Sequence, residues 1–180
     1  MPLLTLGLAL WIWAHAFKRL HPARRANMGD KGKGLMALII VAGVVLMVLG
    51  YRSAPFIFVY EPPTWGQHLN NLLMVFVFYL FASSGAKTRI TRVIRHPQLT
   101  AFGLWAVAHL LANGDLASVI LFGVLLIWAV VTRRVLAGQD WTPPEPATPA
   151  KEARTAIIAL VVFGVVAMIH GWLGPSPFPG

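Results

Sequence analysis

Six long apolar runs, separated by polar and proline-rich stretches, dominate the pattern along the chain. They cover residues 2–17, 35–51, 69–86, 99–112, 116–131 and 156–173. An apolar run of about 17–25 residues is long enough to cross a bilayer as a helix, and a shorter run crosses where the bilayer thins locally. The pattern therefore predicts an all-α fold, a polytopic integral membrane bundle of about six transmembrane helices.

The polar connections between these runs predict how the helices follow one another. The fourth run ends in Asn113-Gly114-Asp115, where Gly114 suits the end of a helix and Asp115 the N-cap of the next. We therefore expect the fourth and fifth helices to form a tight hairpin. Residues 141–154 contain four prolines, which predicts a flexible cytoplasmic linker. No internal repeat or second domain is visible, so residues 1–180 form a single transmembrane domain on this interpretation.

Composition strengthens the membrane prediction and removes several classes of chemistry. The chain is 57% hydrophobic and only 12% charged, whereas soluble domains carry about 25% charged residues. Such a chain cannot cover a globule with polar surface, which argues against a soluble monomer. It has no cysteine, and this excludes disulfides, iron–sulfur clusters, covalently attached haem and a thiolate ligand or nucleophile.

The basic residues predict an orientation in the membrane. The loops after the first, third and fifth runs hold every lysine and arginine except Arg52. The positive-inside rule places these loops in the cytoplasm and both termini outside. The net charge of +9 therefore points to cytoplasmic loops and a lipid bilayer, and not to a nucleic-acid partner. Positive charge follows the first run instead of preceding it, which disfavours a cleaved signal peptide.

Histidines are the ionisable residues that the apolar runs retain. Ionisable side chains are costly inside a bilayer, so each is a candidate functional residue. His15, His109 and His170 lie within runs, while His68 and His96 lie at the ends of runs and His21 in a basic loop.

His15 and His109 share their surroundings. Trp11 and Trp105 precede them by four residues, hence on the same helical face, and an alanine precedes each histidine directly. Small neighbours and aromatic walls suit a flat macrocycle, and two imidazoles from facing helices can hold haem iron. The pattern predicts His15 and His109 as metal ligands, with Trp11 and Trp105 beside the cofactor. It equally allows histidines that bond to a neighbouring helix and tryptophans that anchor at the interface.

Depth arithmetic leaves a second ligand pair open. At 1.5 Å per residue, His15 lies roughly 4.5 Å from the inner surface and His109 roughly 18 Å from it. Two axial ligands must meet at nearly one height. His109 pairs with His68 or His170 in the alternative, because both lie near the outer surface.

A polar cluster, Arg95-His96-Pro97-Gln98, precedes the fourth run. Pro97 suits the first turn of a helix, where its missing N–H costs nothing. Arg95 and His96 are candidate ligands for an anionic group such as a haem propionate, a lipid phosphate or a nucleotide-like cofactor. Positive-inside charge beside a helix-starting proline explains the cluster equally well.

The cluster, together with residues 104–118, resembles the central signature of the NnrU family. Further matches to the family pattern stand along the chain: His15, Pro62-Pro63-Thr64-Trp65 before His68, and His170. The resemblance implies a multi-pass protein of the bacterial inner (cytoplasmic) membrane, associated with denitrification and supporting nitrite and nitric oxide reduction.

The same block is similar to the plant and cyanobacterial 15-cis-zeta-carotene isomerases, membrane proteins that carry haem b. This likeness implies His15 and His109 as haem ligands. Those isomerases have a cysteine where this chain has Ala106. A ligand switch through that thiolate is absent here, so carotene isomerisation does not carry over.

The leading prediction is a haem-b-binding membrane protein in nitrogen-oxide or allied redox metabolism, acting as a sensor, an electron-transfer partner or an isomerase-like catalyst. The alternative is a cofactor-free accessory protein that assists a nitrogen-oxide reductase or another redox partner. A lipid or prenyl-cysteine methyltransferase ranks last, because the acidic residue expected after the hairpin is missing. No acid–base pair or nucleophile stands out, so no enzyme class is assigned.

Overall fold

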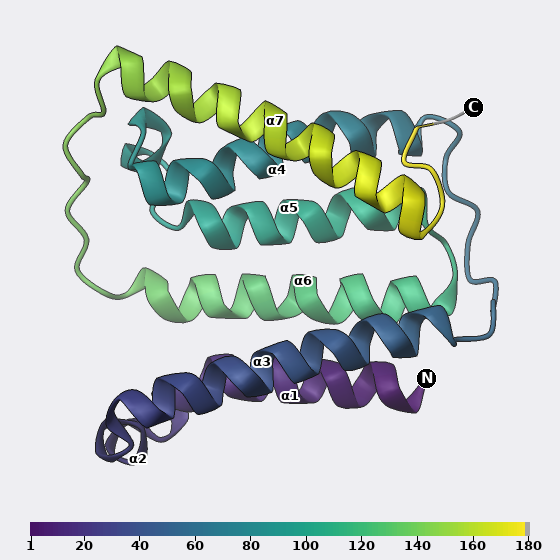
Figure 1. Ribbon diagram of the computed structural model, residues 1–180, viewed down its shortest axis with the longest axis horizontal. Helices are drawn as coiled ribbons and strands as arrows, with labels where there is room; N and C mark the ends of the chain where they lie inside the picture. The colour runs from purple at the N-terminus through teal and green to yellow at the C-terminus, as the bar shows by residue number, and fades with distance from the viewer. Residues whose placement is uncertain (179–180) are drawn as a thin grey trace. The chain divides into compact units, whose positions relative to one another are not determined.

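The protein is described by a computed structural model covering residues 1–178, and these residues are predominantly helical (Figure 1). Each of the six apolar runs lies within a helix, as predicted. A short helix, α2, and a 3-10 helix, η1, add to them. The elements in chain order are α1 (Pro2–Leu20), α2 (Pro22–Asn27), α3 (Gly29–Arg52), α4 (Gly66–Ala86), η1 (Arg89–Arg92), α5 (Pro97–Ala112), α6 (Leu116–Ala137) and α7 (Pro149–Leu173). The single domain predicted for residues 1–180 includes two residues, 179 and 180, that lie outside the described part.

Prolines mark where four of the helices begin. Helices α1, α2, α5 and α7 each carry a proline in the first turn, where its fixed φ suits the helix and its missing N–H is not needed. Several helices also run past their apolar residues. For example, α3 begins at Gly29, six residues before its apolar run, and its first turns include Asp30, Lys31 and Lys33.

Two details of the predicted connections need correction. Helix α5 ends at Asn113 in extended conformation, not at a left-handed Gly114. The Asn113 backbone N and side-chain Nδ2 donate to the His109 carbonyl at 3.0 and 2.8 Å, so this carbonyl is satisfied without a glycine. The flexible linker predicted for residues 141–154 also ends early, since Thr148 caps α7 and residues from Pro149 onward are helical.

The N-cap predicted at Asp115 is confirmed. Its Oδ1 accepts a hydrogen bond from the backbone N of Ser118 at 3.0 Å, in the first turn of α6. Three residues thus separate α5 from α6, and α5 lies against the second half of α6: Phe102 and Trp128 meet with ring centroids 5.5 Å apart.

The chain divides into two compact units, and unit 1 comprises Met1–Tyr60 with Asp115–Val124. Within it α1 and α3 pack antiparallel along their length (Figure 1). Glycines allow the backbones to approach closely. A Cβ at Gly50 would lie 2.7 Å from the Cα of Leu4, and one at Gly7 would lie 2.6 Å from the backbone N of Met47.

Unit 2 comprises Glu61–Gly114 and Leu125–Gly180. Helix α4 packs against both α5 and α7. Its buried Val77 and Leu80 meet Ala101 of α5, and Phe78 meets Phe163 of α7 with ring centroids 6.0 Å apart. Gly66 lies against the backbone of Leu111, where a Cβ would come 3.0 Å from its carbonyl carbon.

Four helices, α3, α4, α6 and α7, are long and apolar enough to cross a membrane. Their apolar surfaces are mostly unpacked; in α7 only 11% of the apolar stretch is buried inside the protein. Such surfaces require a lipid environment, and the protein is a membrane protein. The other two long helices are not among these four: α5 has only 16 residues, and the last turn of α1 carries Lys18 and Arg19. Six crossings and external termini stay predictions.

We expect Gly50→Ala to destabilise unit 1 by about 1–3 kcal/mol, because the new methyl group meets backbone atoms that cannot move aside. The free energy of unfolding in a detergent–SDS titration measures this. Gly34→Ala is the matched control, since Gly34 lies in the same helix with open space around it. Equal destabilisation by the two substitutions contradicts the close α1–α3 contact.

Candidate functional site

His15 lies on α1 and bonds to its own helix. Its Nδ1 is 2.8 Å from the carbonyl oxygen of Trp11. A carbonyl only accepts hydrogen bonds, so Nδ1 is the donor and carries a hydrogen. The Trp11 indole stacks on the imidazole, with ring centroids 3.9 Å apart and planes tilted by 38°. The half-buried imidazole is thus fixed in both rotation and tautomer.

His109 repeats this arrangement on α5. Its Nδ1 donates to the carbonyl oxygen of Trp105 at 2.9 Å. The Trp105 indole contacts the imidazole at a centroid distance of 5.1 Å and a tilt of 51°. The shared Trp–His spacing therefore produces the same hydrogen bond to the carbonyl once in each unit, with a closer ring contact at His15.

This geometry fixes where each neutral imidazole keeps its lone pair. With the hydrogen on Nδ1, the lone pair is on Nε2. Metal-ligating histidines commonly donate the other ring N–H to a backbone carbonyl or carboxylate, which orients the ring. The arrangement at His15 and His109 fits ligation through Nε2, and it equally fits a structural histidine whose Nε2 accepts a hydrogen bond.

The alanines that precede the two histidines serve helix packing. Ala14 is buried in a cluster with Phe17 and Met36, between α1 and α3. Ala108 is completely buried within unit 2.

The aromatic wall around His109 extends further than Trp105. Phe102 contacts Trp105 at 5.2 Å, and the same ring contacts Trp128 of α6. Sequence interpretation missed both residues. Phe102, Trp105 and His109 stand at i, i+3 and i+7, so the helical spacing already placed Phe102 on this face. Trp128 required the tertiary structure.

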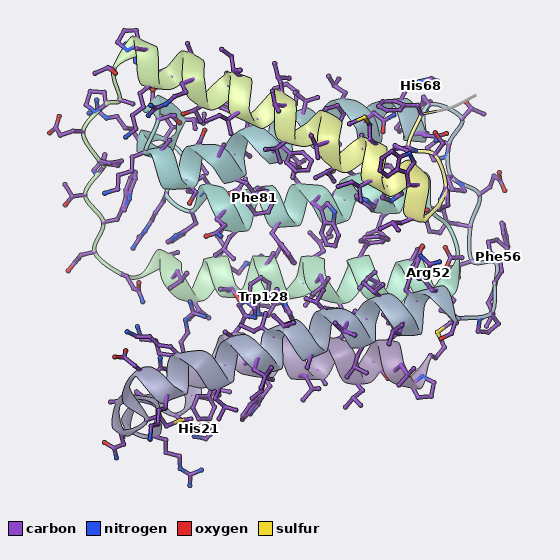
Figure 2. All side chains as sticks on the ribbon, viewed as in Figure 1. His21, Arg52, Phe56, His68, Phe81 and Trp128 are labelled. Carbon is purple, nitrogen blue, oxygen red and sulfur yellow. The ribbon has the colours of Figure 1, made fainter. Side chains whose placement is uncertain are left out.

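The remaining histidines are placed differently. His68 and His170 are exposed, and the Nδ1 of His170 donates to the carbonyl oxygen of Pro175 at 3.0 Å. His170 lies close enough to His109 for an electrostatic interaction. His68 is labelled near the start of α4 in Figure 2, and His21 is exposed beside α2. Within residues 1–178 no group of three or more histidine or acidic side chains forms a metal site.

A family comparison covers nearly the whole chain. The family model described as NnrU protein matches residues 3–177. The chain belongs to the NnrU family. This confirms the resemblance noted in the sequence, and the matched region includes both Trp–His pairs. Searches of curated proteins and of solved structures found no match.

In this NnrU family member Arg95 binds the end of a helix. Its guanidinium donates to the carbonyl oxygens of Ala137 at 2.9 Å and Asp140 at 3.3 Å, and also to that of Gln139. These are carbonyls at the end of α6 and just beyond it, which carry partial negative charge. His96 precedes Pro97, and its carbonyl accepts from the backbone N and the Oγ1 of Thr100 at 2.9 and 3.0 Å.

Unit 1 contains a polar chain that the sequence interpretation missed. The Tyr51 hydroxyl is 2.8 Å from the Oγ of Ser118, and this Oγ donates to the Oδ2 of Asp115. Burial raises the pKa of Tyr60 above its usual value, and the nearby negative charge of Asp115 raises it further. The sequence predicted Asp115 only as an N-cap. Its connection through Ser118 to Tyr51, 64 positions earlier, could not be read from the local sequence.

We expect Arg95→Ala to expose the connection between α6 and α7 to proteases, because three carbonyl contacts disappear together. Arg95→Lys restores little of the protection, since one ammonium cannot reproduce the fork of a guanidinium. Limited proteolysis in detergent, with the cut sites identified by mass spectrometry, measures the effect. The control is Arg92→Ala, an exposed arginine three residues earlier. Unchanged cleavage in Arg95→Ala contradicts this role.

Proposed function

We propose that this protein binds haem b, that His15 and His109 would hold its iron, and that the protein acts in nitrite and nitric oxide metabolism in the bacterial inner membrane. One observation carries the haem proposal: the two histidines share a hydrogen bond from Nδ1 to the carbonyl four residues earlier. Membership of the NnrU family supports the metabolic context.

The residues present suit a non-covalent haem. A porphyrin itself supplies four nitrogen ligands to the iron, and the protein adds only one or two. A cluster of three protein ligands is therefore not needed. Donation from Nδ1 places the lone pair on Nε2, the ring atom through which each histidine would bind iron, and the carbonyl bonds hold each ring in one orientation. Trp11 and Trp105 pack against the imidazoles and restrict their rotation.

Haem b would supply one-electron chemistry, and if His15 and His109 both held the iron, it would have no open position for a small molecule. This favours electron transfer or redox-controlled opening over direct catalysis. The side chains of the chain orient the ligands, exclude water around them and give the cofactor an apolar surrounding. The aromatic wall of Phe102, Trp105 and Trp128 meets that requirement beside His109.

A cofactor-free accessory protein, assisting a nitrogen-oxide reductase or another redox partner, is the second candidate. The same hydrogen bonds fit it equally well, because each imidazole already bonds to a carbonyl and contacts an indole within its own helix. In that case their role is to hold helix geometry. The two candidates are distinguished by the absorption spectrum of the purified protein.

We expect protein purified in detergent, from cells supplied with haem, to show a Soret band that shifts on reduction with dithionite. His109→Gly loses most of this band, and added imidazole restores it because free imidazole replaces the missing ligand. His15→Gly behaves in the same way. His21→Gly is the control, because that histidine is exposed beside α2 and leaves the spectrum unchanged.

Two results contradict the proposal in different ways. A wild-type spectrum without a Soret band at full haem supply favours the accessory role. Retention of the wild-type band in both variants, together with its loss in His68→Ala or His170→Ala, shows that other histidines are the ligands. Circular dichroism of each variant separates ligand loss from unfolding.

A further inference from the structure

Four consecutive apolar residues lie in the connection after α3, outside any helix. Phe56 is 79% exposed, Ile57 44%, Phe58 61% and Val59 46%. In an extended segment neighbouring side chains point to opposite sides. Phe56 and Phe58 lie on the more exposed side, whereas Ile57 and Val59 on the other side are about half covered. Figure 2 shows Phe56 on this connection beyond the end of α3.

Backbone contacts fix the place of this segment. The Ile57 carbonyl oxygen accepts a hydrogen bond from the backbone N of Leu116 at 2.8 Å, and Phe58 forms an isolated antiparallel bridge with Asp115. Leu116 is the first residue of α6, and Arg52 ends α3 four residues before Phe56. The segment therefore lies at the ends of two helices that are apolar enough to cross a membrane.

The length of α6 sets the depth of that point. Residues 116–131 are apolar and rise about 24 Å, against roughly 30 Å for the hydrocarbon layer. Arg133 follows at the far end of this stretch and requires a polar surrounding. With Arg133 at one boundary of the hydrocarbon layer, Leu116 lies at the opposite boundary or just inside it. The Ile57 carbonyl, bonded to Leu116, shares that depth.

We propose that residues 56–59 insert their side chains into the lipid interface and anchor this end of unit 1 in the bilayer. The segment carries no charge between Arg52 and Glu61. The last turns of α3 also expose apolar side chains, since Val45, Val48 and Leu49 are about half exposed. An extended backbone cannot enter the hydrocarbon centre, since its unpaired amides would be unsatisfied. The interface accepts such a backbone and favours aromatic side chains.

Spin labelling tests this directly, because the chain has no cysteine of its own. A nitroxide is attached to Phe56→Cys, and the protein is reconstituted in vesicles of phosphatidylcholine and phosphatidylglycerol. We expect the label to collide more with oxygen, which concentrates in lipid, than with a water-soluble nickel chelate. Leu38→Cys on the exposed face of α3 gives the lipid reference, and Glu145→Cys in the α6–α7 connection gives the water reference.

Two results overturn the proposal. Greater collision with the nickel chelate places the segment in water. Protection from both reagents, with broadening from spin–spin interaction, means that a second copy of the chain covers it; protection without broadening means that another protein segment does. Phe58→Cys repeats the measurement two residues along, on the same side of the segment. Neither substitution removes a buried side chain, and neither result depends on haem.

Discussion

Close contact between helix backbones at glycine is the interaction on which both units depend. Lipid tails are as apolar as leucine, so transmembrane helices gain little by burying apolar side chains against each other. They associate where small residues let their backbones approach, as at Gly50 against Leu4 and at Gly66 against Leu111. Contacts of this kind also lie near the two candidate histidines. Gly43 lies against the backbone of Trp11, and Leu111 follows His109 by two residues.

The hydrogen bond from Nδ1 to the carbonyl four residues earlier gives these histidines a definite state in a place where imidazole is costly. A buried donor left without a partner would be destabilising. The bond to the helix's own carbonyl removes that problem without a second helix. It also means that the backbone of α1 or α5 sets the direction of the ring. Trp11 and Trp105 then limit the remaining rotation.

Sequence patterns predicted the helices well: each of the six apolar runs lies within a helix, and four of those helices in the described residues are long and apolar enough to cross a membrane. They underestimated helix lengths, since charged residues such as those of 29–34 extend α3 beyond its apolar part. The Trp–His spacing predicted the shared face correctly, and the carbonyl bond follows from helix geometry. The contacts of Arg95, Trp128 and Tyr51 depend on residues far away in the chain. Nothing in their local sequence specifies those partners. The prediction that Gly114 ends α5 was wrong, because Asn113 is the C-cap and its side chain donates to the His109 carbonyl in the last turn.

The hydrogen bonds from Arg95 to the end of α6 also set the length of the unrestrained connection between α6 and α7. Residues 138–148 connect α6 to α7, and the contact with the Asp140 carbonyl holds the first three of them. The remaining eight span at most about 28 Å when fully extended. Lengthening this free portion costs little chain entropy, about 0.6 kcal/mol for each doubling. An insertion after Trp141 is therefore the change to the connection that the fold tolerates most easily, whereas one before Asp140 displaces the carbonyls that the guanidinium holds.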